Sequence, residues 1–117
     1  IPAALPDVIN EKNVDKVRAK IIVEGANIPV KEKFETKLHR RGVLVIPDFV
    51  ANAGGVISSF AEYKGYNKEK MFKLVEEKIT KSVEAVLAAV KNRKISPRQA
   101  AREIALQKLG RERRNVL

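Results

Sequence analysis

Residues 20–46 read KIIVEGANIPVKEKFETKLHRRGVLVI, and this run predicts a βαβ unit. Residues 20–24 contain the β-branched apolar run Ile21-Ile22-Val23, and residues 43–46 are all apolar; short continuous runs of this kind are typical of strands buried on both faces. Between them, residues 30–41 carry apolar side chains at helical spacing and stop at Gly42, a residue typical of the position after a helix. Strands joined by about a dozen helical residues form a parallel pair. The predicted fold class is therefore α/β, with a partial Rossmann-like parallel sheet.

The segments that flank this unit are predicted to differ from each other. Residues 1–6 read as the tail of a strand that runs into a loop, and residues 10–18 suit only a short helix. The rest of the chain has the pattern of amphipathic helices. The segment from Asn52 to Tyr63 is expected to begin with small residues and then turn helical, and further helices are expected over residues 68–92 and from Ser96 and Pro97 to about Leu109.

The composition excludes several classes of function. The chain has no Cys, so disulfides, thiolate nucleophiles and thiolate metal sites are absent. No apolar run approaches the roughly 20 residues of a membrane helix, and the N-terminus shows no signal pattern. We therefore expect a soluble, cytoplasmic protein without a membrane partner. The one histidine, His39, lies in a charged stretch and is expected to be solvated rather than catalytic.

The formal net charge of +10 raises the question of nucleic-acid binding. Most of the excess lies in residues 61–117, spread over the polar faces of the predicted helices, and only Arg111, Arg113 and Arg114 form a cluster. Aromatic residues, which stack on bases, make up only 5% of the chain. Nucleic acid is therefore not the expected partner, and a solvated surface or an acidic partner domain explains the charge better.

Three loops are predicted to meet at one edge of the sheet. They contain Pro2-Ala3-Ala4, Glu24-Gly25-Ala26-Asn27, and Pro47-Asp48 followed by Asn52-Ala53-Gly54-Gly55. Ligands bind beyond the carboxyl ends of the strands in parallel α/β sheets. Each loop alone suits a turn, but three together, with small residues beside an amide or carboxylate, predict a ligand-facing crevice. No Ser-His-Asp arrangement, metal cluster or phosphate-binding Gly-rich turn accompanies them, so no catalytic or metal-binding residue is predicted.

Four motifs, at residues 1–4, 23–27, 47–48 and 52–56, carry a resemblance to a known family. In this order and at these spacings they closely resemble the second half of the cofactor domain in the glutamate, leucine, phenylalanine and valine dehydrogenase superfamily. The resemblance covers nearly the whole chain. It implies NAD or NADP as the cofactor.

Within the superfamily the chain is most similar to the glutamate branch, which also has Pro-Ala-Ala, Glu-Gly-Ala-Asn and a serine at the position of Ser59. In that branch the serine hydroxyl binds the side-chain carboxylate of the substrate, and Val56 would line the same pocket. A buried hydroxyl favours a carboxylate over a methyl group. The resemblance implies that the residues facing the cofactor are Ala3, Ala4, Gly25, Ala26, Asn27 and Asn52.

The resemblance also implies a division of the chain and a missing part. Residues 1–66 would be the C-terminal half of a nicotinamide-cofactor-binding Rossmann-like domain, and residues 67–117 a C-terminal helical segment packing on it. The family's catalytic lysine and aspartate belong to an N-terminal substrate domain. We therefore expect a C-terminal fragment or split subunit of an NAD(P)-dependent glutamate dehydrogenase, which converts L-glutamate to 2-oxoglutarate and ammonia, inactive alone. Its expected partners are the N-terminal remainder and, when complete, further copies in a homo-oligomer.

Two alternatives stay open. Gly65-Tyr66-Asn67 resembles the leucine-type enzymes more closely, which allows a fragment of a leucine-type amino-acid dehydrogenase. The other alternative is a non-catalytic basic binding module with the same fold. Such a module would contact either a protein partner or nucleic acid, and its affinity for nucleic acid would depend steeply on salt.

Overall fold

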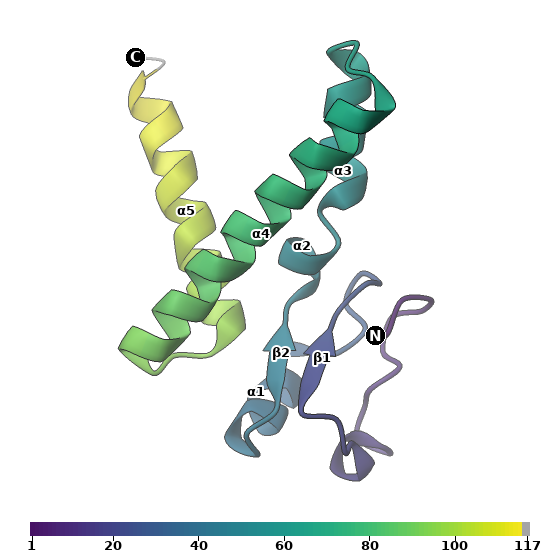
Figure 1. The fold of residues 1–117 in the computed structure, drawn as a ribbon. Coiled ribbons are helices and arrows are strands. Elements are labelled where there is room, and N and C mark those ends of the chain that lie inside the picture. The colour runs from purple at the N-terminus through teal and green to yellow at the C-terminus, as the bar shows by residue number, and fades with distance from the viewer. Residues whose placement is uncertain (116–117) are drawn as a thin grey trace.

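The computed structural model describes residues 1–115, with side chains described through residue 110 (Figure 1). The first half of the chain contains two short strands, a 3-10 helix and two short α-helices, and the second half contains the long helices. In chain order the elements are η1 (Val14–Lys16), β1 (Ile21–Val23), α1 (Glu32–Arg40), β2 (Leu44–Ile46), α2 (Asp48–Ala51), α3 (Gly54–Tyr63), α4 (Lys68–Arg93) and α5 (Pro97–Asn115).

The predicted βαβ unit is confirmed. β1 and β2 pair in parallel, with Ile22 opposite Val45, and α1 connects them. Gly42 follows the end of α1 with a φ of 80°, a left-handed conformation that glycine adopts without steric cost. The fold is therefore α/β, with a two-stranded parallel sheet in the described part of the chain.

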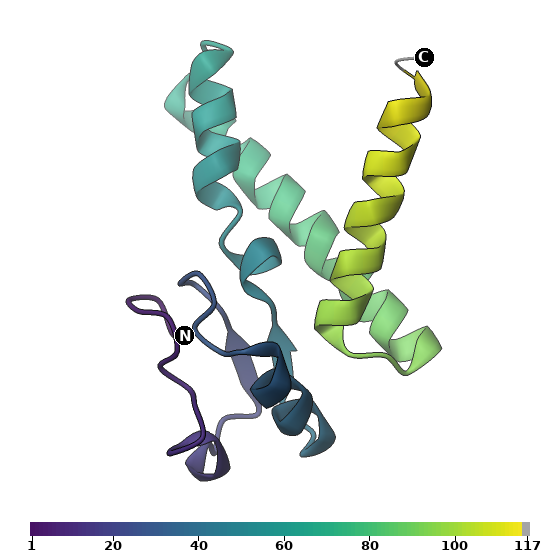
Figure 2. The ribbon, with the colours of Figure 1, turned by 180° about the vertical axis from the view of Figure 1, so that it is seen from behind.

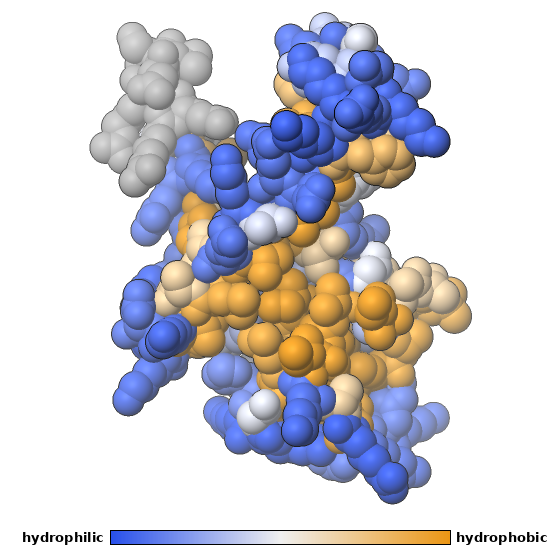
Figure 3. Space-filling model, in the orientation of Figure 1, coloured by the Kyte–Doolittle hydropathy of each residue, from blue (hydrophilic) through white to orange (hydrophobic). Residues whose placement is uncertain are grey.

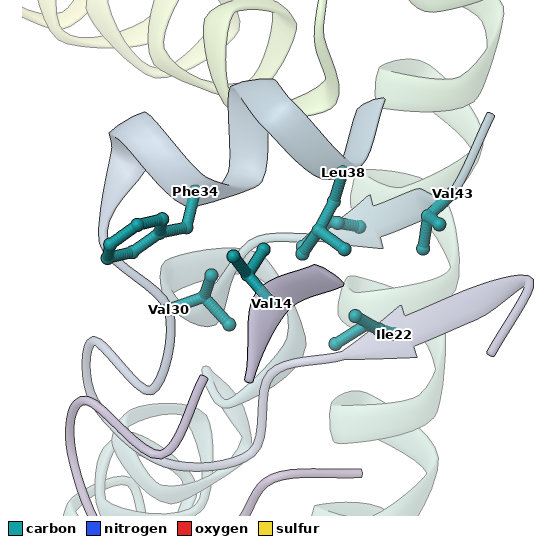
Figure 4. Packing of buried hydrophobic residues seen from close by; sticks show 7 residues of the cluster. Val14, Ile22, Val30, Phe34, Leu38 and Val43 are labelled. Carbon is teal, nitrogen blue, oxygen red and sulfur yellow. The ribbon is translucent and has the colours of Figure 1, made fainter. Parts of the chain in front are cut away.

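One face of the strand pair packs against α1. This first core consists of buried apolar side chains that all come from the first half of the chain (Figure 4). Leu38 of α1 is fully buried here, and Ile22 and Val45 reach it from the two strands. The full set is Val14, Ile22, Val30, Phe34, Leu38, Val43 and Val45.

The opposite face of the strands packs against the long helices. Ile46 alternates with Val45 along β2 and therefore points to the other side of the sheet. It joins Val86 of α4 and Ala100 and Ala101 of α5 in a second core. Figures 1 and 2 show α4 and α5 crossing beside β2, while α3 runs along the far end of α4. The pair of strands thus lies between α1 on one side and α4 and α5 on the other.

Three expected elements differ from the structure. The strand tail expected over residues 1–6 is wrong, because this segment forms neither helix nor strand; Pro2 and Pro6 remove the N–H donors that a ladder needs. The short helix expected over residues 10–18 is only the single 3-10 turn η1. The last helix does not end near Leu109 but continues to Asn115.

No helix within residues 1–115 combines the length and the apolarity that crossing a bilayer requires. His39 lies on α1 and is half-buried.

Candidate functional site

The N-terminal segment lies against the loop that follows β1. The carbonyl oxygen of Pro2 accepts hydrogen bonds from the N–H groups of Gly25 (3.0 Å) and Ala26 (2.9 Å). A Cβ at position 25 would stand 3.1 Å from the Cβ of Ala3, closer than ordinary van der Waals contact, so glycine is what lets the two segments touch. Two of the three predicted loops are therefore confirmed to meet.

The loop that follows α2 joins the same end of the sheet through an amide pair. The Nδ2 atom of Asn52 donates to Oδ1 of Asn27 at 2.7 Å, and it lies 3.5 Å from the carbonyl oxygen of Ala26. The structure thus brings together the loops that follow β1 and β2, as expected for the carboxyl ends of parallel strands, and the N-terminal segment, which follows no strand in the described residues.

The six residues predicted to face a cofactor differ in exposure. Ala3, Ala4 and Asn27 are exposed, while Gly25, Ala26 and Asn52 are half-buried. Small side chains leave room for a flat ring, and a carboxamide has both a donor and an acceptor for another amide. The chemistry of these residues therefore fits the amide-bearing ring of a nicotinamide.

The two residues predicted to face the substrate lie on α3. Val56 is 78% exposed, and Ser59 is also exposed. The hydroxyl groups of Ser58 and Ser59 both donate to the carbonyl oxygen of Gly55, at 2.8 and 3.0 Å. Because a serine hydroxyl has one proton, Ser59 has to release this helix carbonyl before it donates to a carboxylate.

The structure reveals a buried ion cluster that the sequence did not predict. Arg98 of α5 donates from Nε and Nη2 to the two carboxylate oxygens of Glu35 on α1, both at 2.6 Å. Its Nη2 atom also donates to Asp48 (3.0 Å) and to Oε2 of Glu24 (3.2 Å). One guanidinium therefore meets three acidic side chains, and all four side chains are largely removed from solvent.

This cluster corrects one expectation about the crevice. Glu24 and Asp48 were expected to supply carboxylates to a ligand-facing edge, but both are buried, and both pair with Arg98. A carboxylate taken out of water has to be paired and hydrogen-bonded. The signal in the sequence was the position of Glu24 directly after a buried strand, which implied a cation without saying which one.

The pKa values of Glu24 and Asp48 shift in opposite directions, although burial acts to raise both. Burial, reinforced by the neighbouring Glu35 carboxylate, raises the pKa of Glu24 to about 8, against the Asp48 N–H and Arg98. Burial also opposes ionisation of Asp48, but hydrogen bonds from the Ile28 N–H and Arg98 outweigh it and hold the pKa of Asp48 below its ordinary value. Glu24 is therefore largely protonated at neutral pH, while Asp48 is ionised.

Arg98 keeps its charge in this environment. Burial opposes the cation, but hydrogen bonds and charges from Glu35 and Asp48 outweigh it and raise the pKa of Arg98. The residues that the structure describes contain no group of three His, Cys, Asp or Glu side chains arranged to hold a metal ion. The cluster is thus an internal ion network centred on an arginine.

An apolar cavity of about 260 Å³ lies between α2, α3, α4 and α5. Its wall includes Phe49, Ile57, Ile79 and Ile104, with Lys78 and Lys108 among the lining residues. Figure 3 shows apolar surface across the middle of one face of the molecule. None of the residues predicted to face cofactor or substrate lines this cavity.

The basic cluster of the sequence, Arg111, Arg113 and Arg114, lies outside the residues whose side chains the structure describes.

Comparison with protein families gives one match that spans almost the whole chain. The model of the family described as "Glutamate/Leucine/Phenylalanine/Valine dehydrogenase" matches residues 1–115. Among curated proteins, the glutamate dehydrogenase of Aeropyrum pernix is 38% identical over 95% of this chain and 29% of its own length. The NADP(+)-dependent glutamate dehydrogenase of Pyrobaculum calidifontis is 44% identical over 75% of this chain and 20% of its own length.

The solved structures that superpose on this chain are also amino-acid dehydrogenases. The L-tryptophan dehydrogenase of Nostoc punctiforme superposes with a TM-score of 0.85 at 31% identity, over 96% of this chain and 34% of the other. The glutamate dehydrogenase of Peptoniphilus asaccharolyticus superposes with a TM-score of 0.80 at 26% identity, over 92% and 29%. The chain spans about a third or less of each protein that it matches here.

Proposed function

The chain belongs to the glutamate/leucine/phenylalanine/valine dehydrogenase family, and on this premise we propose that it forms the nicotinamide side of an NAD(P)-dependent glutamate dehydrogenase. The observation that carries the proposal is the meeting of three loops at one end of the sheet, held by Pro2 O, Gly25 and the Asn27–Asn52 pair. The curated relatives named above are glutamate dehydrogenases, and one of them uses NADP.

Asn27, Asn52 and the small residues of the first two loops would hold the nicotinamide. The Nδ2 atom of Asn52 donates to Oδ1 of Asn27 and so aligns the Asn27 amide. This bond leaves the Nδ2 donor of Asn27 unused. Ala3 and Ala4 would lie against the ring as exposed, small side chains, with Gly25 and Ala26 behind them. The nicotinamide would supply a hydride acceptor for the amino acid, and these residues would orient it without moving a proton themselves.

Val56 and Ser59 would contact the substrate from α3. The Ser59 hydroxyl would turn from the Gly55 carbonyl to the side-chain carboxylate of glutamate, and Val56 would contact the apolar part of the substrate. The groups that move protons in this proposal lie in the N-terminal substrate domain of the family. Residues 1–117 are therefore proposed to be inactive alone, with the rest of the dehydrogenase as partner and a homo-oligomer as the complete enzyme.

A fusion tests the proposal. Residues 1–117 would replace the matching segment of the Aeropyrum pernix glutamate dehydrogenase, and cofactor reduction would be measured with glutamate, leucine and tryptophan. The expected result is turnover with glutamate in the fusion and none with residues 1–117 alone. A folded fusion that binds glutamate but reduces neither NAD nor NADP would contradict the proposal. Running both cofactors in parallel also decides between them.

One observation favours a second candidate with the same chemistry. The superposition on L-tryptophan dehydrogenase has a TM-score of 0.85, against 0.80 for the glutamate enzyme. The second candidate is a dehydrogenase for a larger or apolar amino acid, which includes the leucine type. Turnover of leucine or tryptophan above that of glutamate in the fusion would select it.

A further inference from the structure

Arg98 lies in the first turn of α5, and its guanidinium reaches the two loops that follow β1 and β2. It contacts Glu24, the first residue after β1, and Asp48, the second residue after β2. These partners are 74 and 50 positions away in the sequence. The Arg98 side chain of α5 is therefore hydrogen-bonded to both loops close to the ends of their strands.

Asp48 links Arg98 to the loop that follows β1 through two further hydrogen bonds. One of its carboxylate oxygens accepts from Arg98, and the other accepts from the N–H of Ile28 at 2.9 Å. Its own N–H donates to Oε2 of Glu24 at 2.9 Å, in a buried hydrogen bond. The first loop is thus held at Glu24 and at Ile28, on either side of Asn27.

The outer ends of the two loops meet in the Asn52–Asn27 hydrogen bond of 2.7 Å. Asn52 follows directly after α2, the short helix that Asp48 begins. The position of Asn52 therefore depends on where Asp48 is held, and the position of Asn27 depends on Glu24 and Ile28. A change at Arg98 would be transmitted to both amides through backbone that is already hydrogen-bonded.

The charges of the cluster make Arg98 hard to replace. Without it, the acidic groups of Glu24, Glu35 and Asp48 would remain close together and buried with no cation. The guanidinium uses Nε and Nη2 for Glu35 and shares Nη2 with the other two acidic groups. A lysine ammonium has one nitrogen and lacks this planar fork. Lysine at this position would keep the charge and lose the geometry.

We propose that Arg98 is a positioning residue, which holds the loops after β1 and β2 at the spacing that the Asn27–Asn52 pair requires. The consequence for cofactor binding rests on the proposed function, but the positioning itself does not. Through Arg98 the C-terminal helix α5 acts on loops at the opposite end of the sequence, in addition to packing on the second core.

The test compares Arg98→Lys with Arg102→Lys in the 117-residue chain. Arg102 is the matched control: it lies one turn further along α5 and also pairs with an acidic residue of α1, Glu32 at 3.0 Å, but this pair is exposed. Amide hydrogen exchange and ¹H–¹⁵N NMR spectra report on both loops. The Leu44 N–H, bonded to Lys20 O in the strand pair, serves as the internal reference.

In Arg98→Lys we expect the Ile28 N–H to exchange at least about 10-fold faster relative to Leu44, and the side-chain amide resonances of Asn52 to shift. Arg102→Lys should change neither. A folded Arg98→Lys variant with unchanged Ile28 exchange and Asn52 resonances overturns the proposal, as do equal changes in both variants. If Arg98→Lys does not fold, Asp48→Asn, which keeps the Arg98–Glu35 pair, replaces it: a shifted Asn52 amide supports the proposal and an unchanged one overturns it.

The fusion enzyme separates this proposal from the proposed function. With Arg98→Lys we expect the KM for the cofactor to rise about 10-fold while the KM for glutamate changes less than about 2-fold. Loops that move in the NMR experiment without any change in the cofactor KM would leave the positioning by Arg98 intact and overturn the cofactor role of the loops. Unchanged NMR spectra overturn the positioning whatever the kinetics show.

Discussion

The two cores of the molecule are built in different ways. The first core is formed entirely by residues 14–45. Its large side chains, such as Leu38 and Phe34, pack on one face of the strand pair. The second core joins Ile46 and Val50 to Val86 and two alanines that lie much later in the chain. The first core is therefore local and filled by large apolar side chains, whereas the second depends on the docking of distant helices.

Exposed apolar side chains occur in both halves of the chain. Apolar side chains of the helical half remain in solvent, and Figure 3 shows apolar surface across the middle of one face. Exposed large apolar residues of α3, α4 and α5 are Val56, Phe60, Tyr63, Phe72, Leu87, Leu106 and Leu109. In the first half of the chain, Ile1, Leu5, Val8, Ile21, Ile28 and Phe49 are exposed as well, so both halves offer apolar surface beyond what the two cores cover.

The largest expected effect compares a leucine from each half. Leu38→Ala removes a fully buried side chain from the first core and should lower the free energy of unfolding by about 3–5 kcal/mol. Leu106 of α5 is 62% exposed, so Leu106→Ala should change stability by less than about 0.5 kcal/mol. Urea unfolding followed by circular dichroism measures both. Equal losses would show that the two halves are not packed differently.

A pH titration tests the cluster that joins the halves. Because the pKa of Glu24 is raised from 4.5 to about 8, the folded state binds more protons than the unfolded state between these values. The stabilisation is fully present below pH 4.5 and is lost progressively as the pH rises to about 8. Glu24→Gln should flatten this slope in urea unfolding at pH 5, 6.5 and 8. Glu103→Gln on the exposed side of α5 should keep the wild-type slope.

Two adjacent serines test whether α3 serves the substrate. Ser58 and Ser59 make the same hydrogen bond to Gly55 O, so their structural roles in the helix are matched. In the fusion enzyme, Ser59→Ala should lower kcat/KM for glutamate by about 1–3 kcal/mol of transition-state binding, with the cofactor KM nearly unchanged. Ser58→Ala should leave both nearly unchanged. Equal loss in the two variants would make Ser59 a structural residue only.

The smallest effect concerns the start of α4. Asn67 caps this helix by accepting a hydrogen bond from the Lys70 N–H at 2.9 Å. Asn67→Ala should cost about 1 kcal/mol of stability, while Asn67→Ser should restore most of it. Thermal unfolding of the three proteins measures this difference. No loss in Asn67→Ala would mean that packing against α3 alone holds the N-terminus of α4.

Local pattern predicted the α/β half well. Continuous apolar runs at Ile21–Val23 and Leu44–Ile46 became the parallel strands, and Gly42 ended α1 as expected. The meeting of the loops also followed, because the carboxyl ends of parallel strands share one edge of a sheet. The strand tail predicted over residues 1–6 was wrong. The segment is apolar, but its two prolines have no N–H groups to donate to a neighbouring strand.

The ion cluster could not be predicted in the same way. Glu24 and Asp48 were expected to face a ligand, Glu35 carried no signal, and Arg98 is one of 24 Lys and Arg residues. A buried carboxylate implies a cation, but its choice depends on which helix docks over the loops. That docking is set by the packing of Ala100 and Ala101 near Val86. The small side chains of the two alanines give only a weak hydrophobic pattern in the sequence.

By itself, the sequence determined the βαβ unit, the order of the helices and the family, because periodicity, turn residues and motif spacing act over short stretches of chain. Only the tertiary structure decided that Ala3 packs closely against Gly25, that the Ser59 hydroxyl donates to the Gly55 carbonyl, and that Arg98 links α5 to both loops. These contacts join residues through space, and close approach and burial, rather than local propensity, select their partners.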